Sequence, residues 1–140
     1  MEKVFVDSDV ILDLLAKREP HYRSAAILFS QVEKGALQAF ISPLILANLF
    51  YILRKSTSNA RAKETLKKFK TLVQILPVND KTMEQALNSE FPDFEDAVQY
   101  YTAIESEIKI LITRNKKDYK KAAMTICTAE EFLGSRKISI

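Results

Sequence analysis

The stretch VFVDSDVILDLL, residues 4–15, sets a strand and a helix directly one after the other. Lys3 to Val6 is a short apolar run containing Val and Phe, which predicts a buried strand. From Ser8 onward the apolar residues recur at helical spacing, which predicts a helix. Asp7 therefore falls where the strand ends and the helix begins.

The same alternation continues to the end of the chain. Further strands are expected at residues 37–41, 72–78, 108–113 and 124–127, where short apolar runs occur. Helices are expected at 22–33, 42–55, 59–70, 79–88, 93–107 and 116–122, with a last short one after Thr128. Ser42-Pro43 is a good helix start, and Thr128 with Glu131 forms a capping box. Strands alternating with helices predict an α/β fold, a parallel sheet covered on both faces.

Length and composition fit one soluble domain covering residues 1–140. Of the 140 residues, 47% are hydrophobic and 28% are charged, and two glycines and four prolines leave little room for linkers. The N-terminal residues do not resemble a signal peptide, and the apolar run at 41–53 is too short to span a bilayer. The single Cys127 fits a reducing compartment. We expect a cytoplasmic protein with no membrane partner.

Basic side chains gather in two segments although the net charge is only +3. Residues 54–70 hold seven basic residues against Glu64 alone, and residues 114–121 hold five against Asp118 alone. Such segments are commonly solvated helix faces. Beside an acidic site they also suit a polyanionic substrate whose phosphates approach a bound metal.

Aspartates stand at three of the expected helix starts. Asp7, Ser8 and Asp9 follow the first strand, and capping of the next helix explains them locally. Asp93 and Asp96 open the helix at 93–107, where capping is again sufficient. Because ligands of parallel sheets bind beyond the carboxyl ends of the strands, these acids are also candidates for one shared site.

The segment after the strand at 108–113 adds a third group to that edge. Thr113, Asn115 and Asp118 lie just past the strand, with helix capping by Asn115 as the alternative explanation. Like-charged carboxylates crowded together raise one another's proton affinity unless a divalent cation neutralises them. Oxygen ligands of this kind suit Mg²⁺ or Mn²⁺.

Two further polar residues lie on expected helices. Asn48 is the one strongly polar side chain between Pro43 and Leu53, and we expect its amide to point inward. It either makes a structural hydrogen bond or contacts water or substrate on the wall of the site. Asp13 lies off the apolar stripe of its helix and is expected on the solvated surface.

At these residues the sequence resembles the PIN-domain ribonucleases, and within them the VapC-like toxins of bacterial toxin–antitoxin pairs. The likeness covers nearly the whole chain. Four motifs carry it in order: an Asp-x-Asp pattern at 6–10, a central helix at 42–55, DFEDA at 93–97 and TRN-x-x-D-aromatic at 113–119. The resemblance implies a three-layer sandwich around a five-stranded parallel sheet, with one or two Mg²⁺ or Mn²⁺ ions on a carboxylate cluster.

The resemblance also implies roles for individual residues. It makes Asp7, Asp96 and Asp118 the acids that hold metal and act in catalysis, with Asn115 as their neighbour. Ser8, Asp9, Asn48, Asp93 and Thr113 become supporting residues of the site. Arg114, Lys116 and Lys117 are expected to hold the RNA backbone. One departure is Asn48, where PIN domains commonly have a glutamate, and an amide binds a divalent cation more weakly than a carboxylate.

The function that follows is a metal-dependent endoribonuclease that cleaves single-stranded RNA, with an antitoxin and a second copy of the chain as expected protein partners. The main alternative is a PIN-like module that binds RNA or protein without catalysis, because the glutamate is missing. A phosphatase with an Asp-x-Asp nucleophile fits less well, since Ile11 stands where such enzymes usually have Thr or Val. His21 is expected at the surface, and one histidine supports no His-based nucleophile chemistry.

Overall fold

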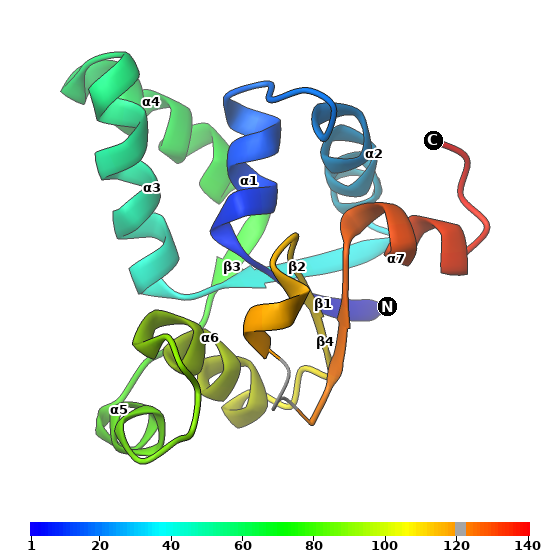
Figure 1. Ribbon diagram of the computed structural model, residues 1–140. Helices are drawn as coiled ribbons and strands as arrows, with labels where there is room; N and C mark the ends of the chain where they lie inside the picture. The colour runs from blue at the N-terminus through cyan, green and yellow to red at the C-terminus, as the bar shows by residue number, and fades with distance from the viewer. Residues whose placement is uncertain (120–122) are drawn as a thin grey trace.

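Five parallel strands form the central sheet in the computed structural model, which describes residues 1–119 and 123–140 (Figure 1). In chain order the strands are β1 (Glu2–Val6), β2 (Leu37–Ile41), β3 (Val73–Ile75), β4 (Ile110–Ile112) and β5 (Thr125–Cys127). Their order across the sheet is β3-β2-β1-β4-β5, and each neighbouring pair is parallel. The predicted five-stranded parallel sheet is confirmed.

The last three strands are shorter than the sequence predicts, because apolar runs report burial whereas strands require ladder bonding. Pairing continues only one residue past β3 and β4, through bonds from Leu76 N–H to the Ile41 carbonyl (2.8 Å) and from Thr113 N–H to the Cys127 carbonyl (2.9 Å). Ile108 is buried, but its N–H bonds the carbonyl of Ala103 at the end of a helix. The predicted limits of 72–78, 108–113 and 124–127 were therefore too wide.

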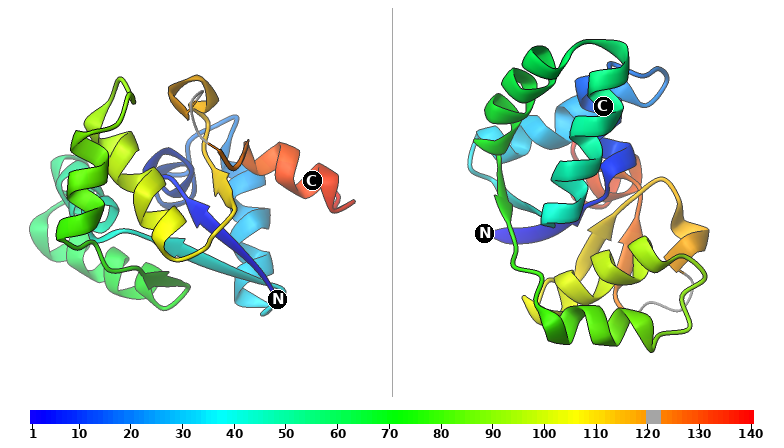
Figure 2. Two further views of the ribbon diagram at one scale, coloured as in Figure 1. Left: turned by 90° about the horizontal axis from the view of Figure 1, so that it is seen from below. Right: turned by 90° about the vertical axis from the view of Figure 1, so that its left-hand side faces the viewer.

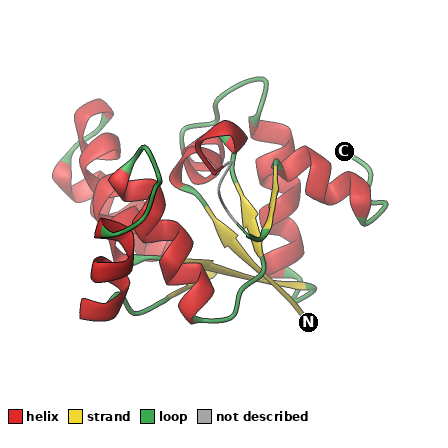
Figure 3. Cartoon of the chain, turned by 60° about the horizontal axis from the view of Figure 1, so that its bottom comes forward, coloured by secondary structure: helices red, strands yellow, loops and turns green. Residues whose placement is uncertain are grey.

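Helices cover both faces of the sheet, which confirms the three-layer arrangement. They are α1 (Ser8–Leu15), α2 (Tyr22–Glu33), α3 (Pro43–Ser56), α4 (Asn59–Lys70), α5 (Asp80–Leu87), α6 (Phe94–Glu105) and α7 (Ala129–Ser135). Figure 1 and Figure 2 show α5 and α6 on one side of the sheet and α1, α2 and α7 on the other. The strands lie between these groups of helices in Figure 3.

The predicted capping signals begin the helices as expected. The Ser42 hydroxyl accepts a hydrogen bond from the N–H of Ile45 (3.1 Å), and Thr128 with Glu131 forms the capping box at α7. Instead of the helix predicted at 116–122, a short 3-10 helix, η1 (Lys116–Tyr119), follows β4. The rest of that prediction, including Lys120 and Lys121, lies outside the described residues.

The strand order places a crevice at the centre of the sheet. From β1 the chain builds β2 and β3 on one side and β4 and β5 on the other, so the order reverses between β1 and β4. Ligands of open parallel sheets bind at such a switch point, beyond the carboxyl ends of the strands. Asp7 comes directly after β1 and Thr113 directly after β4, so both stand at this crevice.

The core is built from strands buried on both faces. Val4, Phe5 and Val6 of β1 and Leu111 and Ile112 of β4 are fully buried. A rigid pair of central strands therefore carries the residues at the switch point. In the described part of the chain, no helix combines the length and apolar character needed to cross a membrane.

Candidate active site

Asp7 is the central residue of the site and is almost completely buried. Its backbone is held to β4 by a bond from its N–H to the Ile112 carbonyl (2.9 Å). Its Oδ1 accepts from the N–H of Ser8 (2.8 Å) and so caps α1. Its Oδ2 accepts from the hydroxyls of Thr113 (3.0 Å) and Tyr119 (3.2 Å). The carboxylate of Asp7 therefore caps α1 and also faces the other side chains of the site.

Asp96 faces Asp7 across the Tyr119 hydroxyl. That hydroxyl lies 3.3 Å from Asp96 Oδ1, so one group contacts carboxylates from α1's start and from α6. The helix start that presents Asp96 is fixed by Asp93, whose Oδ1 accepts from the Asp96 N–H (3.1 Å). The fold thus brings together two acids that are 89 positions apart in the sequence.

The two carboxylates are crowded and poorly solvated. Burial raises the pKa of Asp7 to about 6, and the negative charge of Asp9 adds to the increase. Burial also raises the pKa of Asp96 to about 7, with further increases from the charges of Asp7, Asp93 and Asp118. The pKa of the Tyr119 hydroxyl is raised by burial and by these acids, so it is a neutral donor. A divalent cation would relieve the repulsion.

Asp9 lies beside this pair and is tied to the loop after β4. Its Oδ2 accepts from the N–H of Arg114 (3.0 Å) and lies 3.3 Å from the Thr113 hydroxyl. Its Oδ1 is buried and has no hydrogen-bond partner within residues 1–119 and 123–140. Burial raises the pKa of Asp9 as well. At this edge of the sheet, the described residues therefore offer fewer hydrogen-bond donors than the carboxylate oxygens can accept.

Comparison with known proteins shows the family of the chain. A family model described as PIN domain matches residues 3–117. The chain belongs to the PIN domain family. It is 25% identical over 136 residues to a protein named Ribonuclease VapC1 from Aquifex aeolicus, covering 94% of this chain and 93% of that one.

Solved structures share the PIN fold at low sequence identity. A toxin–antitoxin complex from Klebsiella pneumoniae matches with a TM-score of 0.67 at 22% identity, covering 90% of this chain and 97% of that chain. VapBC2 from Rickettsia felis, bound to a DNA fragment from its promoter, matches with a TM-score of 0.66 at 18% identity, covering 89% and 96%. A sarcin–ricin loop cleaving toxin, VapC20 of Mycobacterium tuberculosis, matches with a TM-score of 0.62 at 17% identity, covering 77% and 86%.

The prediction that Asp13 lies on the solvated surface is wrong for this PIN domain. Its exposed fraction is 1%, and it binds two arginines. Arg114 Nε and Nη2 donate to its two oxygens (2.7 and 3.1 Å), and Arg18 Nε donates to Oδ1 (3.1 Å). The apolar stripe of α1 did not include Asp13, but the loops after α1 and β4 cover that side of the helix. Burial there is possible because the charge is paired.

Of the residues expected to hold RNA, Arg114 is engaged within the protein, whereas Lys116 and Lys117 are exposed. Arg114 is half-buried and turned toward Asp13, which leaves its guanidinium committed to that contact. Lys116 donates to both carboxylate oxygens of Glu131 at 3.0 Å in an exposed pair. Lys117 is exposed. Exposed pairs contribute little to stability, so Lys116 and Lys117 are available to phosphates.

The remaining predicted residues lie around the two acids. Asp118 is half-buried, and its charge contributes to the raised pKa of Asp96. Asn115 is exposed, and its N–H donates to the Thr113 hydroxyl (3.1 Å). Ser8 contributes its backbone N–H to Asp7. The amide of Asn48 was expected to point inward. Asn48 is instead half-buried, and its amide donates to Glu95 Oε2 at 3.4 Å.

Whether a divalent cation fits depends on the donor set. Within the described residues, no three or more His, Cys, Asp or Glu side chains form a ready-made metal cluster. Asp7 and Asp96 nevertheless provide two carboxylates that contact one hydroxyl, and the charge of Asp118 acts on Asp96. Mg²⁺ is often held by one or two carboxylates, with water and phosphate completing its coordination. The residues present fit such a cation.

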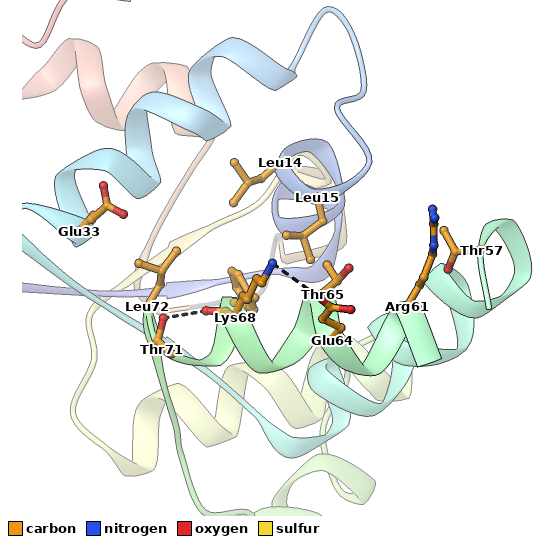
Figure 4. A pocket seen from close by; sticks show the side chains of 11 residues that line it. Leu14, Leu15, Glu33, Thr57, Arg61, Glu64, Thr65, Lys68, Thr71 and Leu72 are labelled. Carbon is orange, nitrogen blue, oxygen red and sulfur yellow. Dashed lines mark hydrogen bonds and ion pairs between the residues drawn. The ribbon is translucent and has the colours of Figure 1, made fainter. Parts of the chain in front are cut away.

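A separate hollow lies between α1 and α4 and is shown in Figure 4. Leu14 and Leu15 from α1 and Arg61 and Lys68 from α4 contribute to its lining, and Lys68 pairs with Glu64 there (3.7 Å). None of the predicted site residues lines it. It is therefore distinct from the acidic edge of the sheet.

Sequence reasoning missed the contacts of Tyr119 with the two acids and the contact of Glu95 with Asn48. Tyr119 enters the sequence motif only as its aromatic end, and the apolar pattern gives no reason to place its hydroxyl between two acids. Its placement after Asp118 is the signal that could have drawn attention to it. Glu95 lies one residue before Asp96, and a contact with Asn48 47 positions away leaves no local signal.

Proposed function

We propose that this PIN domain is a metal-dependent endoribonuclease that cleaves single-stranded RNA and acts as the toxin of a toxin–antitoxin pair. The observation that carries the proposal is the carboxylate pair at the switch point of the sheet, in which Asp7 is buried and Asp96 is half-buried. Among residues 1–119 and 123–140, neither acid has an arginine or lysine in ion-pair contact. A divalent cation is the natural counter-charge for such a pair.

In this proposal Asp7 and Asp96 hold Mg²⁺ or Mn²⁺, with Asp118 beside them. When bound, such a cation supplies Lewis acidity at the scissile phosphate. Thr113 and the Ser8 N–H fix the carboxylate of Asp7, and Asp93 fixes the start of the helix that carries Asp96. Positioning of this kind lowers the barrier by pre-organising the site before substrate arrives.

The substrate and partner are supported by relatives. A curated relative is named a ribonuclease, and solved structures of the same fold are toxin–antitoxin complexes. Exposed Lys116 and Lys117 follow β4 and Thr113, where they can meet RNA phosphates. The proposal includes an antitoxin protein as partner, a second copy of the chain and a cytoplasmic location, the last supported by the lone Cys127.

Cleavage of a single-stranded RNA oligonucleotide by the purified chain tests the function. With Mg²⁺ or Mn²⁺ we expect cleavage by the wild type, and a loss of at least about 100-fold in Asp7→Asn or after chelation. Asp80→Asn is the matched control, because Asp80 is an exposed acid in the first turn of α5. Cleavage that persists in Asp7→Asn or in the chelator would contradict the proposal.

A non-catalytic RNA- or protein-binding PIN domain is the second candidate. It is favoured by Asn48, which stands where a glutamate is common, and by the lack of a three-ligand cluster within the described residues. Calorimetric titration with Mg²⁺ and Mn²⁺ separates the two candidates. RNA binding without cation binding or cleavage would favour the non-catalytic domain.

A further inference from the structure

Tyr119 is fixed in place by an aromatic cluster beneath the site. Its exposed fraction is 2%, and its ring meets that of Phe91 edge-on, with centroids 6.1 Å apart. Phe91 also packs against Tyr100 (5.0 Å) and Tyr101 (6.2 Å) of α6. Rings held on several sides have little freedom to turn. The hydroxyl of Tyr119 therefore has a defined position between Asp7 and Asp96.

That hydroxyl engages one oxygen of each acid. It lies 3.2 Å from Asp7 Oδ2 and 3.3 Å from Asp96 Oδ1. A phenol carries one proton, so it donates to one carboxylate at a time. Both distances are longer than the usual O–H···O bond, as expected for a donor shared between two acceptors.

The hydrogen bonds of Asp7 leave limited room for a cation. Each carboxylate oxygen offers about two acceptor sites. Two hydroxyls lie within hydrogen-bond distance of Asp7 Oδ2, those of Thr113 (3.0 Å) and Tyr119 (3.2 Å), and each shares its single proton with a second acid, Asp9 or Asp96. Oδ1 has one described donor, the N–H of Ser8 (2.8 Å), and so keeps one site. Asp7 is therefore arranged to give a cation one oxygen, not two.

We propose that Tyr119 restricts Asp7 and Asp96 to one-oxygen coordination and thereby makes the site selective for Mg²⁺ over Ca²⁺. This role rests on the metal-dependent function proposed above. Mg²⁺ requires a compact octahedron in which water fills several positions, whereas Ca²⁺ takes more ligands and readily accepts both oxygens of a carboxylate. Tyr119 is a positioning residue here, since it acts through Asp7 and Asp96.

Tyr119→Phe tests this role, with Mg²⁺ and Ca²⁺ binding measured by calorimetry on RNA-free protein. Removing the hydroxyl frees Asp7 Oδ2 and Asp96 Oδ1 for a second bond to the larger cation. We expect Ca²⁺ affinity to rise relative to Mg²⁺ affinity by at least about fivefold. A loss of packing would weaken both cations together, so the ratio separates positioning from a merely structural role.

Tyr100→Phe is the matched control. Tyr100 is also buried, lies in the same aromatic cluster, and uses its hydroxyl to accept from the N–H of Ala123 (3.0 Å). The same atom is removed, but neither acid loses a hydrogen-bond donor. The ratio of the two affinities should stay at the wild-type value. A ratio that is unchanged in Tyr119→Phe, or equally changed in both variants, overturns the role of Tyr119.

Two further measurements separate the possible failures. If Tyr119→Phe does not fold by circular dichroism, Thr113→Val removes the other side-chain donor to Asp7 Oδ2. It should shift the affinity ratio in the same direction, and an unchanged ratio there overturns the proposal. A wild-type protein that binds neither cation overturns the metal-dependent function itself. An unchanged ratio in a protein that binds Mg²⁺ overturns only the role of Tyr119.

Discussion

Two groups of charged side chains lie near Thr113, and they differ in whether a positive charge compensates the carboxylates. In the arginine-paired group, Asp13 is buried and binds both Arg18 and Arg114. In the carboxylate pair, Asp7 and Asp96 share a neutral hydroxyl and carry raised pKa values of about 6 and about 7. Arginines of the protein neutralise the carboxylate of the first group, whereas no described arginine or lysine pairs with the carboxylates of the second.

The contrast distinguishes a structural role from a functional one. A buried carboxylate that is paired with arginines needs no ligand to compensate its charge. Crowded carboxylates without a paired cation raise the free energy of the metal-free protein, and such sites are typical of ligand binding. Asp9 joins the two groups, because it accepts from the N–H of Arg114 and lies next to the hydroxyl that binds Asp7.

Asp13→Asn should break the arginine-paired group at the largest cost in stability. It removes the charge that two arginines bind, and we expect the free energy of unfolding to fall by about 2–3 kcal/mol, less than for a fully buried pair because both arginines are partly exposed. Urea denaturation measures the change. Glu64→Gln, which removes an exposed pair with Lys68, should change it by less than about 0.5 kcal/mol. Equal effects of the two variants would remove the contrast.

The carboxylate pair predicts that the metal-free protein loses stability as pH rises. A carboxyl whose pKa is higher in the folded than in the unfolded state binds its proton more tightly when folded. Stability is then greatest below the unfolded value near 4 and falls as pH rises through about 6 for Asp7 and about 7 for Asp96. Ionisation of Asp7 alone should lower the free energy of unfolding by on the order of 2–3 kcal/mol.

Comparison with Asp7→Asn isolates that contribution from other titrating groups. In chelator, the variant should be more stable than the wild type at pH 8 and close to it at pH 4, as measured by urea denaturation. Saturating Mg²⁺ should reduce the difference at pH 8. A stability difference that does not depend on pH would mean that Asp7 is not destabilised by ionisation.

Asn48→Glu adds a negative charge next to Glu95, which precedes Asp96 by one residue. Because the Asn48 amide lies 3.4 Å from Glu95, the new carboxylate should lower metal-free stability by about 1 kcal/mol through repulsion. It should also tighten Mg²⁺ binding severalfold, as seen by calorimetry, without lowering cleavage. Asn48→Gln keeps an uncharged amide and serves as the control. Unchanged Mg²⁺ affinity would show that α3 does not line the metal site.

The smallest expected effect concerns the cations at the rim. Lys116→Ala/Lys117→Ala should flatten the salt dependence of RNA binding by somewhat under one unit of slope for each phosphate that is no longer neutralised. Lys67→Ala/Lys68→Ala on α4 removes equal charge away from the acidic edge and should change the slope less. RNA affinity measured from low to moderate salt gives both slopes. A larger change in the α4 variant would move the RNA path onto that helix.

Much of the fold could be predicted because its signals are local. Local signals are the apolar run before Asp7 and the caps at Ser42, Asp93 and Thr128, since each depends only on residues close in sequence. The structure has a strand or helix at each of them. Strand limits were less accurate, since burial extends beyond ladder bonding at β3, β4 and β5. The sequence also indicated Asp7 and Asp96 as members of one edge, because each follows a strand or opens a helix.

The tertiary structure alone decided what each polar side chain faces. Asp13 meets Arg114 across 101 positions, and Tyr119 meets Asp7 across 112, so no local pattern could reveal either contact. Both depend on β1 lying next to β4, a pairing set by the order of the whole sheet. The sequence by itself determined where the carboxylates begin their helices. Which of them are neutralised by arginines, and which stay crowded around one hydroxyl, was settled by long-range packing, because charge pairing depends on distance in space and not along the chain.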